Sequence, residues 1–166
     1  MTASRLIATF FYFGYLRPAP GTWGSLAALP VAWALVIVGG PWALVAGVVV
    51  SYVAGHWATA TETRGKDDHD PSEIVIDEVC GQWIALLPVA FGAQMTGSDV
   101  SALWPGTVAA FIFFRYFDIT KPGPVGWADR KAGPTGVMLD DVIAGVVAAL
   151  AVMAIAAGAH MLIASL

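Results

Sequence analysis

Two adjacent pairs of carboxylates are the clearest candidates for chemistry in this sequence. Asp77-Glu78 follows the apolar run 74–76, and Asp140-Asp141 precedes the apolar run 142–163. A carboxylate at a helix start complements the helix dipole, but one is enough for that purpose. Two adjacent carboxylates supply the hard oxygen ligands that Mg²⁺ prefers. We therefore predict that both pairs bind a divalent cation, with helix capping as the alternative.

A third acidic position, Asp118, closes the apolar run 102–117. A carboxylate at a helix C-terminus is unfavourable for the dipole, so Asp118 needs a cation or an ion pair with Arg115 or Lys121. Asp129-Arg130 follows in the same segment. Interleaved acidic and basic groups of this kind can bind a metal ion together with a phosphate monoester, whose charge the basic side chains neutralise.

A glycine-rich stretch, Gly21-Thr22-Trp23-Gly24-Ser25, opens another apolar run. Free backbone N–H groups at a helix start bind anions, and glycine lets a ligand approach closely. The stretch is not a P-loop, because no Lys follows the glycines. We predict phosphate contacts at Gly21, Thr22, Gly24 and Ser25, against the alternative of an ordinary Gly/Pro-rich helix start.

The composition places these residues in a membrane protein. Apolar residues make up 58% of the 166 positions and charged residues only 12%, about half the usual share. Such a chain cannot cover its apolar surface with polar groups, so lipid must cover part of it. Disorder is excluded, the net charge of −4 excludes a basic nucleic-acid binder, and the single cysteine excludes an intrachain disulfide.

The apolar runs predict an all-α polytopic membrane bundle that forms one domain over residues 1–166. Gly39-Gly40-Pro41 and Gly97-Ser98-Asp99 are turn signals that produce two helical hairpins. Residues 6–16 are too few to span and are expected to form an interfacial helix or a re-entrant element. The five predicted spans are 22–38, 42–58, 79–96, 102–117 and 142–163.

The charges are distributed unevenly over this topology. All the lysines and arginines would lie on one side, and of the acidic residues only Asp99 would lie on the other. This asymmetry predicts that the charged side is cytoplasmic. Three polar segments, 14–25, 61–78 and 115–141, meet on that side. The eight basic residues are Arg5, Arg17, Arg64, Lys66, Arg115, Lys121, Arg130 and Lys131.

Two further groups of residues receive a structural interpretation. The acidic run Asp67, Asp68, Asp70 and Glu73 is interpreted as a solvated loop that supplies no metal ligand. Most tryptophans flank span ends, which is typical of an interfacial belt. These are Trp23, Trp42, Trp57, Trp83, Trp104 and Trp127.

Four linked motifs between about residues 14 and 150 resemble the phosphatidylglycerophosphatase A family. They read Gly14-x-x-x-Pro18-x-Pro20-Gly21-Thr22-x-Gly24-Ser25, Ile74-Val75-Ile76-Asp77-Glu78-x-x-Gly81-x-Trp83, Phe114-Arg115-x-x-Asp118-x-x-Lys121-Pro122-x-Pro124 with Asp129-Arg130, and Gly136-x-Met138-x-Asp140-Asp141-x-x-Ala144-Gly145. The resemblance implies a bacterial inner-membrane, magnesium-dependent phosphatase. Its phospholipid substrate would be phosphatidylglycerol phosphate, which it would convert to phosphatidylglycerol.

On this interpretation the acidic residues would share one or two Mg²⁺, and Arg115, Lys121 and Arg130 would neutralise the phosphoryl oxygens. Water is the expected nucleophile. A covalent phosphate on Asp118 is the alternative, although the D-x-D-x-T pattern of haloacid dehalogenases is missing. The expected metal ligands are Asp77, Glu78, Asp118, Asp140 and Asp141.

Two other classes of protein remain as alternatives. A CDP-alcohol phosphatidyltransferase is also a small membrane enzyme with interfacial carboxylates, but its D-G-x-x-A-R signature is absent. A transporter carries ionisable residues at mid-span, whereas the centres of these spans hold none.

Overall fold

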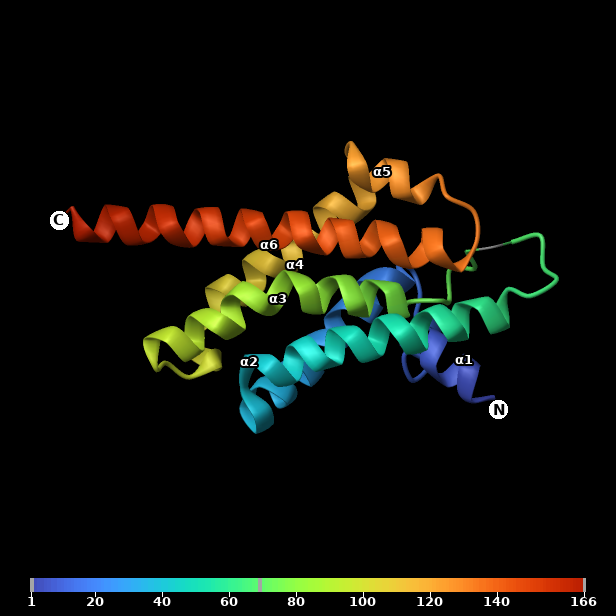
Figure 1. Cartoon of the computed structure of the whole chain (residues 1–166), viewed down its shortest axis with the longest axis horizontal. Coiled ribbons are helices and arrows are strands. Elements are labelled where there is room, and N and C mark those ends of the chain that lie inside the picture. The colour runs from blue at the N-terminus through green and yellow to red at the C-terminus, as the bar shows by residue number, and fades with distance from the viewer. Residues whose placement is uncertain (1, 69, 166) are drawn as a thin grey trace.

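The computed structural model describes residues 2–68 and 70–165, and within these ranges the chain is helical and without strands. Figure 1 shows the long helices packed side by side, with the C-terminal part of the last helix extending beyond the rest. The elements in order are α1 (Ala3–Ala8), η1 (Phe13–Tyr15), α2 (Pro20–Glu62), α3 (Ile76–Thr96), η2 (Val100–Leu103), α4 (Trp104–Thr120), α5 (Pro124–Asp129) and α6 (Pro134–Ala164).

The longest helix, α2, is folded back on itself as the glycines predict. Gly39 and Gly40 have non-helical backbone angles, and Gly40 has φ 67°, a conformation that costs glycine little. Pro41 then starts the second arm, where its missing N–H costs no hydrogen bond. The two arms contact each other where the Leu35 side chain lies over Gly47. The predicted hairpin is therefore confirmed.

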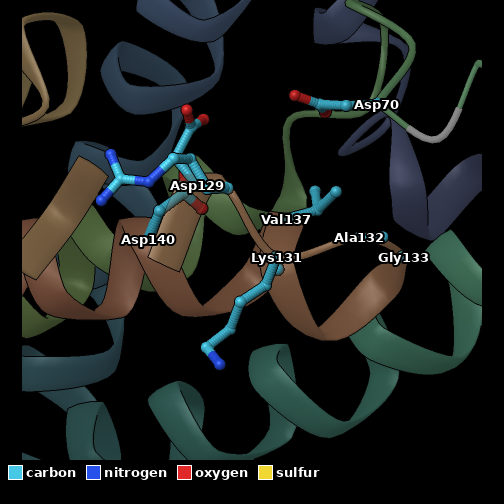
Figure 2. A pocket seen from close by; sticks show the side chains of 9 residues that line it. Asp70, Asp129, Lys131, Ala132, Gly133, Val137 and Asp140 are labelled. Atoms are coloured by element: carbon cyan, nitrogen blue, oxygen red, sulfur yellow. The ribbon is translucent and has the colours of Figure 1, made fainter. Parts of the chain in front are cut away.

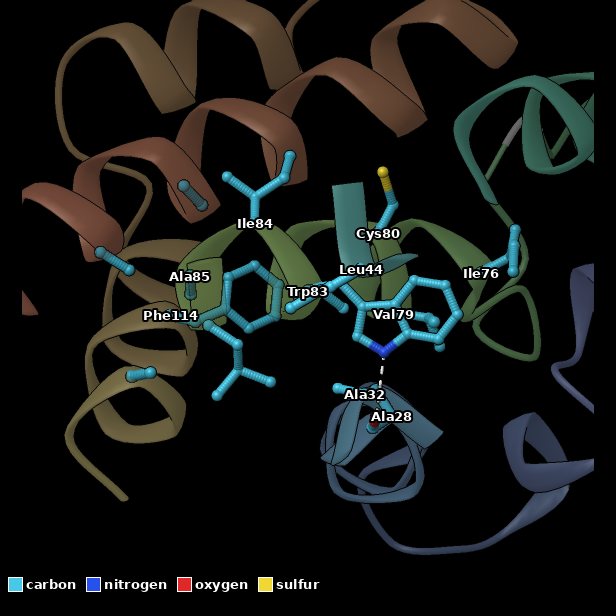
Figure 3. Close-up of a cluster of buried hydrophobic side chains, with 14 of the residues drawn as sticks. Ala28, Ala32, Leu44, Ile76, Val79, Cys80, Trp83, Ile84, Ala85 and Phe114 are labelled. Atoms are coloured by element: carbon cyan, nitrogen blue, oxygen red, sulfur yellow. Dashed lines mark hydrogen bonds between the residues drawn. The ribbon is translucent and has the colours of Figure 1, made fainter. Parts of the chain in front are cut away.

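The centre of the bundle is α3. In its apolar stretch of 18 residues 61% is buried inside the protein, against 17–28% in the corresponding stretches of α2, the η2–α4 segment and α6. Figure 3 shows Trp83 of α3 pointing toward the first arm of α2, where its Nε1–H donates to the Ala28 carbonyl at 2.9 Å. The prediction of Trp83 in an interfacial belt is therefore wrong, because its N–H finds a partner inside the bundle. The other five predicted belt tryptophans are exposed.

Within the described residues, four helices are long and apolar enough to cross a membrane: α2, α3, the η2–α4 segment (Val100–Thr120) and α6. Large apolar side chains are exposed along their outer faces, among them Ile37, Val50, Ile112 and Ile155. In water this surface would be unfavourable, whereas lipid covers it without cost. The fold is therefore that of an all-α membrane protein.

Two helix boundaries differ from the sequence-based expectation, the end of the first helix and the start of the last. The N-terminal helix covers only Ala3–Ala8, because Phe10 and Phe11 have positive φ and break it. The last helix begins at Pro134, so Asp140 and Asp141 lie almost two turns inside α6 and do not cap it. Helix capping therefore does not explain this acidic pair.

The polar segments converge at one end of the bundle. Figure 1 shows the N-terminus, α1, α5, the segment after α2 and the start of α6 at one end, and the turns after Gly39 and Thr96 at the other. Within the first of these ends the N-terminal segment binds its neighbours directly, since the Val75 N–H donates to the Ala8 carbonyl at 2.8 Å and Ser4 Oγ donates to Glu62 at 2.6 Å. We call this end the charged end.

Candidate active site

A polar cavity of about 250 Å³ opens at the charged end, and we call it the acidic chamber. Its walls come from the start of α2, the segment before α3, the first turn of α3, the end of α4 and the second turn of α6. The lining residues are Ala19, Pro20, Gly21, Asp70, Ser72, Ile74, Asp77, Glu78, Arg115, Asp118, Lys121, Asp140 and Asp141.

The carboxylates of the acidic chamber form two groups of three that share one member. Asp77, Glu78 and Asp141 make the first group, and Asp118, Asp140 and Asp141 make the second. Within each group one ligand oxygen from every residue lies within 4.8 Å of the others. All five predicted metal ligands thus come together from three helices. A shared carboxylate between two neighbouring groups is the arrangement that two-metal phosphatases use.

Three carboxylate oxygens in these groups lack a hydrogen-bond partner within the described residues. They are Glu78 Oε2, Asp140 Oδ1 and Asp141 Oδ1, each buried from solvent. A buried acceptor without a partner costs roughly 1–3 kcal/mol, and more when it is charged. A hard divalent cation among these oxygens would remove that cost, so the residues present fit Mg²⁺.

Arg115 holds the two carboxylate groups together on the α4 side. Its Nη1 lies 2.7 Å from Asp118 Oδ2 and 4.0 Å from Glu78 Oε1, and it donates to Ser25 Oγ at 3.3 Å. The ion pair that the sequence offered as an alternative for Asp118 therefore exists. Asp118 also belongs to a possible cation group, and its two carboxylate oxygens allow both interactions.

Lys121 ends α4 in a left-handed conformation, with φ 47°, and reaches across to α6. Its Nζ donates to Asp140 Oδ2 at 2.6 Å and also to Asp129 Oδ1. Partial burial lowers the pKa of Lys121, but the hydrogen bonds to Asp129 and Asp140 outweigh burial and leave the pKa above its usual value. The ammonium is thus a fixed positive charge on the chamber wall.

The glycine-rich start of α2 packs closely on the site. A side chain on Gly21 would collide with Glu78 Oε1, and one on Gly24 would lie 2.8 Å from Val75 Cβ. Ser25 Oγ donates to the Gly21 carbonyl at 2.9 Å. Of the four predicted phosphate contacts, only Gly21 lines the chamber. Close packing explains both glycines, and phosphate contact by Thr22, Gly24 and Ser25 stays a prediction.

Asp70 is a site residue that the sequence analysis did not identify. It was interpreted as part of a solvated loop, yet it lines the acidic chamber. The chamber walls desolvate its carboxylate, although part of the residue stays exposed, and this desolvation and then the negative charge of Asp140 raise its pKa to about 6. A turn in which the Ile74 N–H donates to the Pro71 carbonyl, at 2.8 Å, leads the segment from Asp70 into α3. No local pattern separates Asp70 from its acidic neighbours; only the fold does.

Arg130 does not line the acidic chamber. It lines an adjoining cavity of about 230 Å³, which we call the Arg130 cavity and which Figure 2 shows from close by. Asp70 and Asp140 line both spaces. Arg130 therefore lines a different part of the site from Arg115 and Lys121, and its contact with a phosphoryl oxygen stays a prediction.

The chain is similar to known proteins over most of its length. A family model described as phosphatidylglycerophosphatase A matches residues 6–156. The chain is 35% identical over 146 residues to phosphatidylglycerophosphatase A of Escherichia coli (strain K12), covering 87% of this chain and 78% of that protein. It is 34% identical over 151 residues to the protein of that name from Haemophilus influenzae, covering 90% and 86%.

A third relative has a different name. A protein of Bacteroides thetaiotaomicron, provisionally named a phosphatidylinositol-3-phosphatase, is 39% identical over 146 residues, covering 85% of this chain and 86% of that protein. No solved structure matches the chain. All three relatives carry the names of lipid phosphatases, in agreement with a phosphate site on a membrane protein.

Proposed function

Since this chain belongs to the phosphatidylglycerophosphatase A family, we propose that it hydrolyses the terminal phosphomonoester of phosphatidylglycerol phosphate. The products are phosphatidylglycerol and phosphate, and the reaction depends on Mg²⁺. The observation that carries the proposal is the pair of carboxylate groups that share Asp141 in the acidic chamber.

The acidic residues of the chamber are proposed to bind cations, and its basic residues are proposed to bind phosphate. The five carboxylates would hold one or two Mg²⁺, which when bound supply Lewis acidity and lower the pKa of water. Arg115 and Lys121, which line the same chamber beside Asp118 and Asp140, would orient the phosphoryl oxygens. Water attacks phosphorus, the bond to the glycerol oxygen breaks, and the glycerol oxygen takes the proton that water loses. Arg115 engages one oxygen of Asp118, and water remains the proposed nucleophile.

The membrane placement follows from the exposed apolar surface. In this proposal the two arms of α2 cross separately, which with α3, α4 and α6 gives five crossings. The diacylglycerol body of the substrate stays in the bilayer while its headgroup enters the acidic chamber. The basic residues of the sequence belong to the segments of the charged end, and this supports, by the positive-inside rule, the proposal that the chamber faces the cytoplasm from the bacterial inner membrane.

The proposal is tested with purified protein in non-ionic detergent. Phosphate release from phosphatidylglycerol phosphate should require Mg²⁺, stop with EDTA and recover when Mg²⁺ is added in excess. Phosphatidylinositol 3-phosphate, suggested by the name of the Bacteroides relative, serves as the competing substrate. Lack of release from phosphatidylglycerol phosphate, or release that EDTA leaves intact, would contradict the proposal.

The orientation requires a separate measurement in oriented vesicles. Impermeant reagents should modify Lys66 and Lys131 only from the cytoplasmic side, and a Ser98→Cys variant only from the opposite side. Lys66 and Lys131 belong to the charged end, whereas Ser98 follows α3 at the other. Modification of Ser98→Cys from the cytoplasmic side would show that α3 and α4 do not cross.

A further inference from the structure

The Arg130 cavity lies next to the acidic chamber without belonging to it. The two cavities share the walls formed by Asp70 and Asp140. Lys121 reinforces this partition, since its ammonium binds Asp140 on the shared wall and Asp129 in the Arg130 cavity. A ligand that fills both spaces must therefore carry two polar groups separated by a short linker.

The charges of the Arg130 cavity differ from those of the acidic chamber. No complete cation group lies in it, because within the described residues Asp140 is the one member of the two groups that lines it. Asp140 and Asp129, which also lines the cavity, are both bound by Lys121. Two basic residues line it as well, Arg130 and Lys131. The cavity therefore holds no complete carboxylate group for a metal ion and has basic groups that suit an anion.

Arg130 is the cation whose hydrogen-bonding capacity is left for a ligand. Arg115 and Lys121 are paired with carboxylates, whereas Arg130 makes no ion pair with the described residues. The Lys131 ammonium lies 4.1 Å from the centre of the Trp127 ring, and in Figure 2 its side chain extends away from Asp70 and Asp129. A guanidinium without a carboxylate partner matches the oxygens of a phosphate well.

Arg130 lies close to α5. A Cβ built on Gly126 would be 3.5 Å from its Nη1, an ordinary contact distance, and 2.6 Å from the Lys121 carbonyl. A larger residue at 126 would therefore displace the turn that carries Lys121, next to Arg130.

We infer that the Arg130 cavity binds the second phosphate of the substrate, the phosphodiester that links the headgroup glycerol to the diacylglycerol. This inference rests on the proposed function. Phosphatidylglycerol phosphate carries a monoester and a diester at opposite ends of one glycerol. With the monoester among the carboxylates of the acidic chamber, the diester lies one glycerol away, across the partition and beside Arg130. Arg130 is accordingly a specificity residue that distinguishes this lipid from lipids with a single phosphate.

The test compares two substrates in maltoside micelles that contain no other phospholipid. Phosphatidylglycerol phosphate has both phosphates, whereas phosphatidic acid has only a monoester. In Arg130→Gln, the ratio of kcat/KM for the first substrate to that for the second should fall about tenfold, through KM, because a charge-assisted contact to phosphate is lost. Arg130→Lys should retain part of the preference. Arg64→Gln, which removes an exposed charge from the segment after α2, should leave the ratio unchanged.

A second measurement uses phosphatidylglycerol, which has the diester and no monoester, as an inhibitor. It should compete with substrate in the wild-type protein, and Arg130→Gln should require about tenfold more of it for the same inhibition. The maltoside micelles of the first measurement contain no phospholipid besides the substrate. If Arg130→Gln loses the preference for phosphatidylglycerol phosphate over phosphatidic acid in them, the phosphodiester that Arg130 binds is therefore that of the substrate and not that of a neighbouring lipid.

The outcomes separate this inference from the proposed function. An equal loss on both substrates in Arg130→Gln, with inhibition by phosphatidylglycerol unchanged, would overturn the inference and leave phosphatidylglycerol phosphate as the substrate. A wild-type protein that does not hydrolyse phosphatidylglycerol phosphate would overturn both.

Discussion

The polar groups at the two ends of the bundle are satisfied in different ways. At the far end, Gly40 and Gly97 adopt positive φ and turn the chain with little polar surface; the acidic residue there, Asp99, caps η2 by accepting from the Ser101 N–H at 2.7 Å. At the charged end, Asp77, Asp140 and Asp141 are buried inside helices. Local hydrogen bonds satisfy the first end, whereas the second keeps acceptors without partners.

This difference shows where the molecule carries an energetic cost for function. Buried carboxylates that share Asp141 repel one another and are poorly solvated, and bound cations or hydrogen bonds have to offset that cost. The far end needs no such compensation. Substitutions of equal size should therefore have unequal effects at the two ends.

The largest effect is expected from removing the charge of one ligand. Asp77→Asn, Glu78→Gln, Asp118→Asn and Asp140→Asn should each lower the turnover of phosphatidylglycerol phosphate by at least about 100-fold, because loss of metal-ion catalysis removes several kcal/mol of transition-state stabilisation. The amides keep the volume of the side chains, so the proteins should still insert and purify. Asp99→Asn at the far end is the matched control and should retain full turnover; near-normal turnover in any ligand variant would eliminate that residue as an essential ligand.

A large effect on stability is expected where α3 meets α4 and α6. A methyl group on Gly81 would collide with the Phe114 ring and lie 2.5 Å from the Asp141 carbonyl. Gly81→Ala should therefore reduce the free energy of unfolding in detergent by about 1–3 kcal/mol, the usual cost of overpacking.

The matched control for this change is Gly158→Ala, in the part of α6 that extends beyond the bundle. No atom lies within 4 Å of a Cβ at that position, and alanine favours helix over glycine by about 1 kcal/mol. Thermal unfolding should show Gly158→Ala at or above the wild-type midpoint and Gly81→Ala below it. Equal midpoints would show that the close packing of α3 beneath the acidic chamber does not limit stability.

A smaller effect is expected from Asp70, which lines both cavities but belongs to neither carboxylate group. Asp70→Asn should lower kcat/KM by roughly three- to tenfold, below the about 10- to 100-fold that loss of an outer contact of a metal site typically costs, because Asp70 stays partly exposed. Asp68→Asn, in the same exposed segment and absent from both cavities, is the control. A loss as large as that of Asp118→Asn would make Asp70 a ligand.

Much of the fold follows from local signals in the sequence. The turns at Gly39-Gly40 and Gly97, the start of α3 at Asp77-Glu78 and the convergence of the three polar segments are predicted by helix-breaking residues and by the charge asymmetry. These features depend on neighbouring residues or on counting, which the sequence supplies directly.

The features that the sequence does not predict depend on contacts between distant residues. Trp83 resembles the belt tryptophans until its N–H meets the Ala28 carbonyl of another helix. The sequence around Asp70 does not distinguish it from its solvated neighbours, and only the folded segment brings it to the chamber. Arg130 resembles Arg115 and Lys121 until α5 places it in a separate cavity. No residue pattern within one segment encodes such distances.

The central claim is that carboxylates from three helices form a divalent-cation site at the charged end and nowhere else in the described chain. Titration of the purified protein with Mn²⁺, followed by electron paramagnetic resonance, tests it without a substrate. The wild-type protein and Asp99→Asn should bind Mn²⁺ equally, with Mg²⁺ competing, and Asp118→Asn and Asp141→Asn should bind it at least about tenfold more weakly. Absence of Mn²⁺ binding by the wild-type protein, or equal binding by all four proteins, would contradict the account.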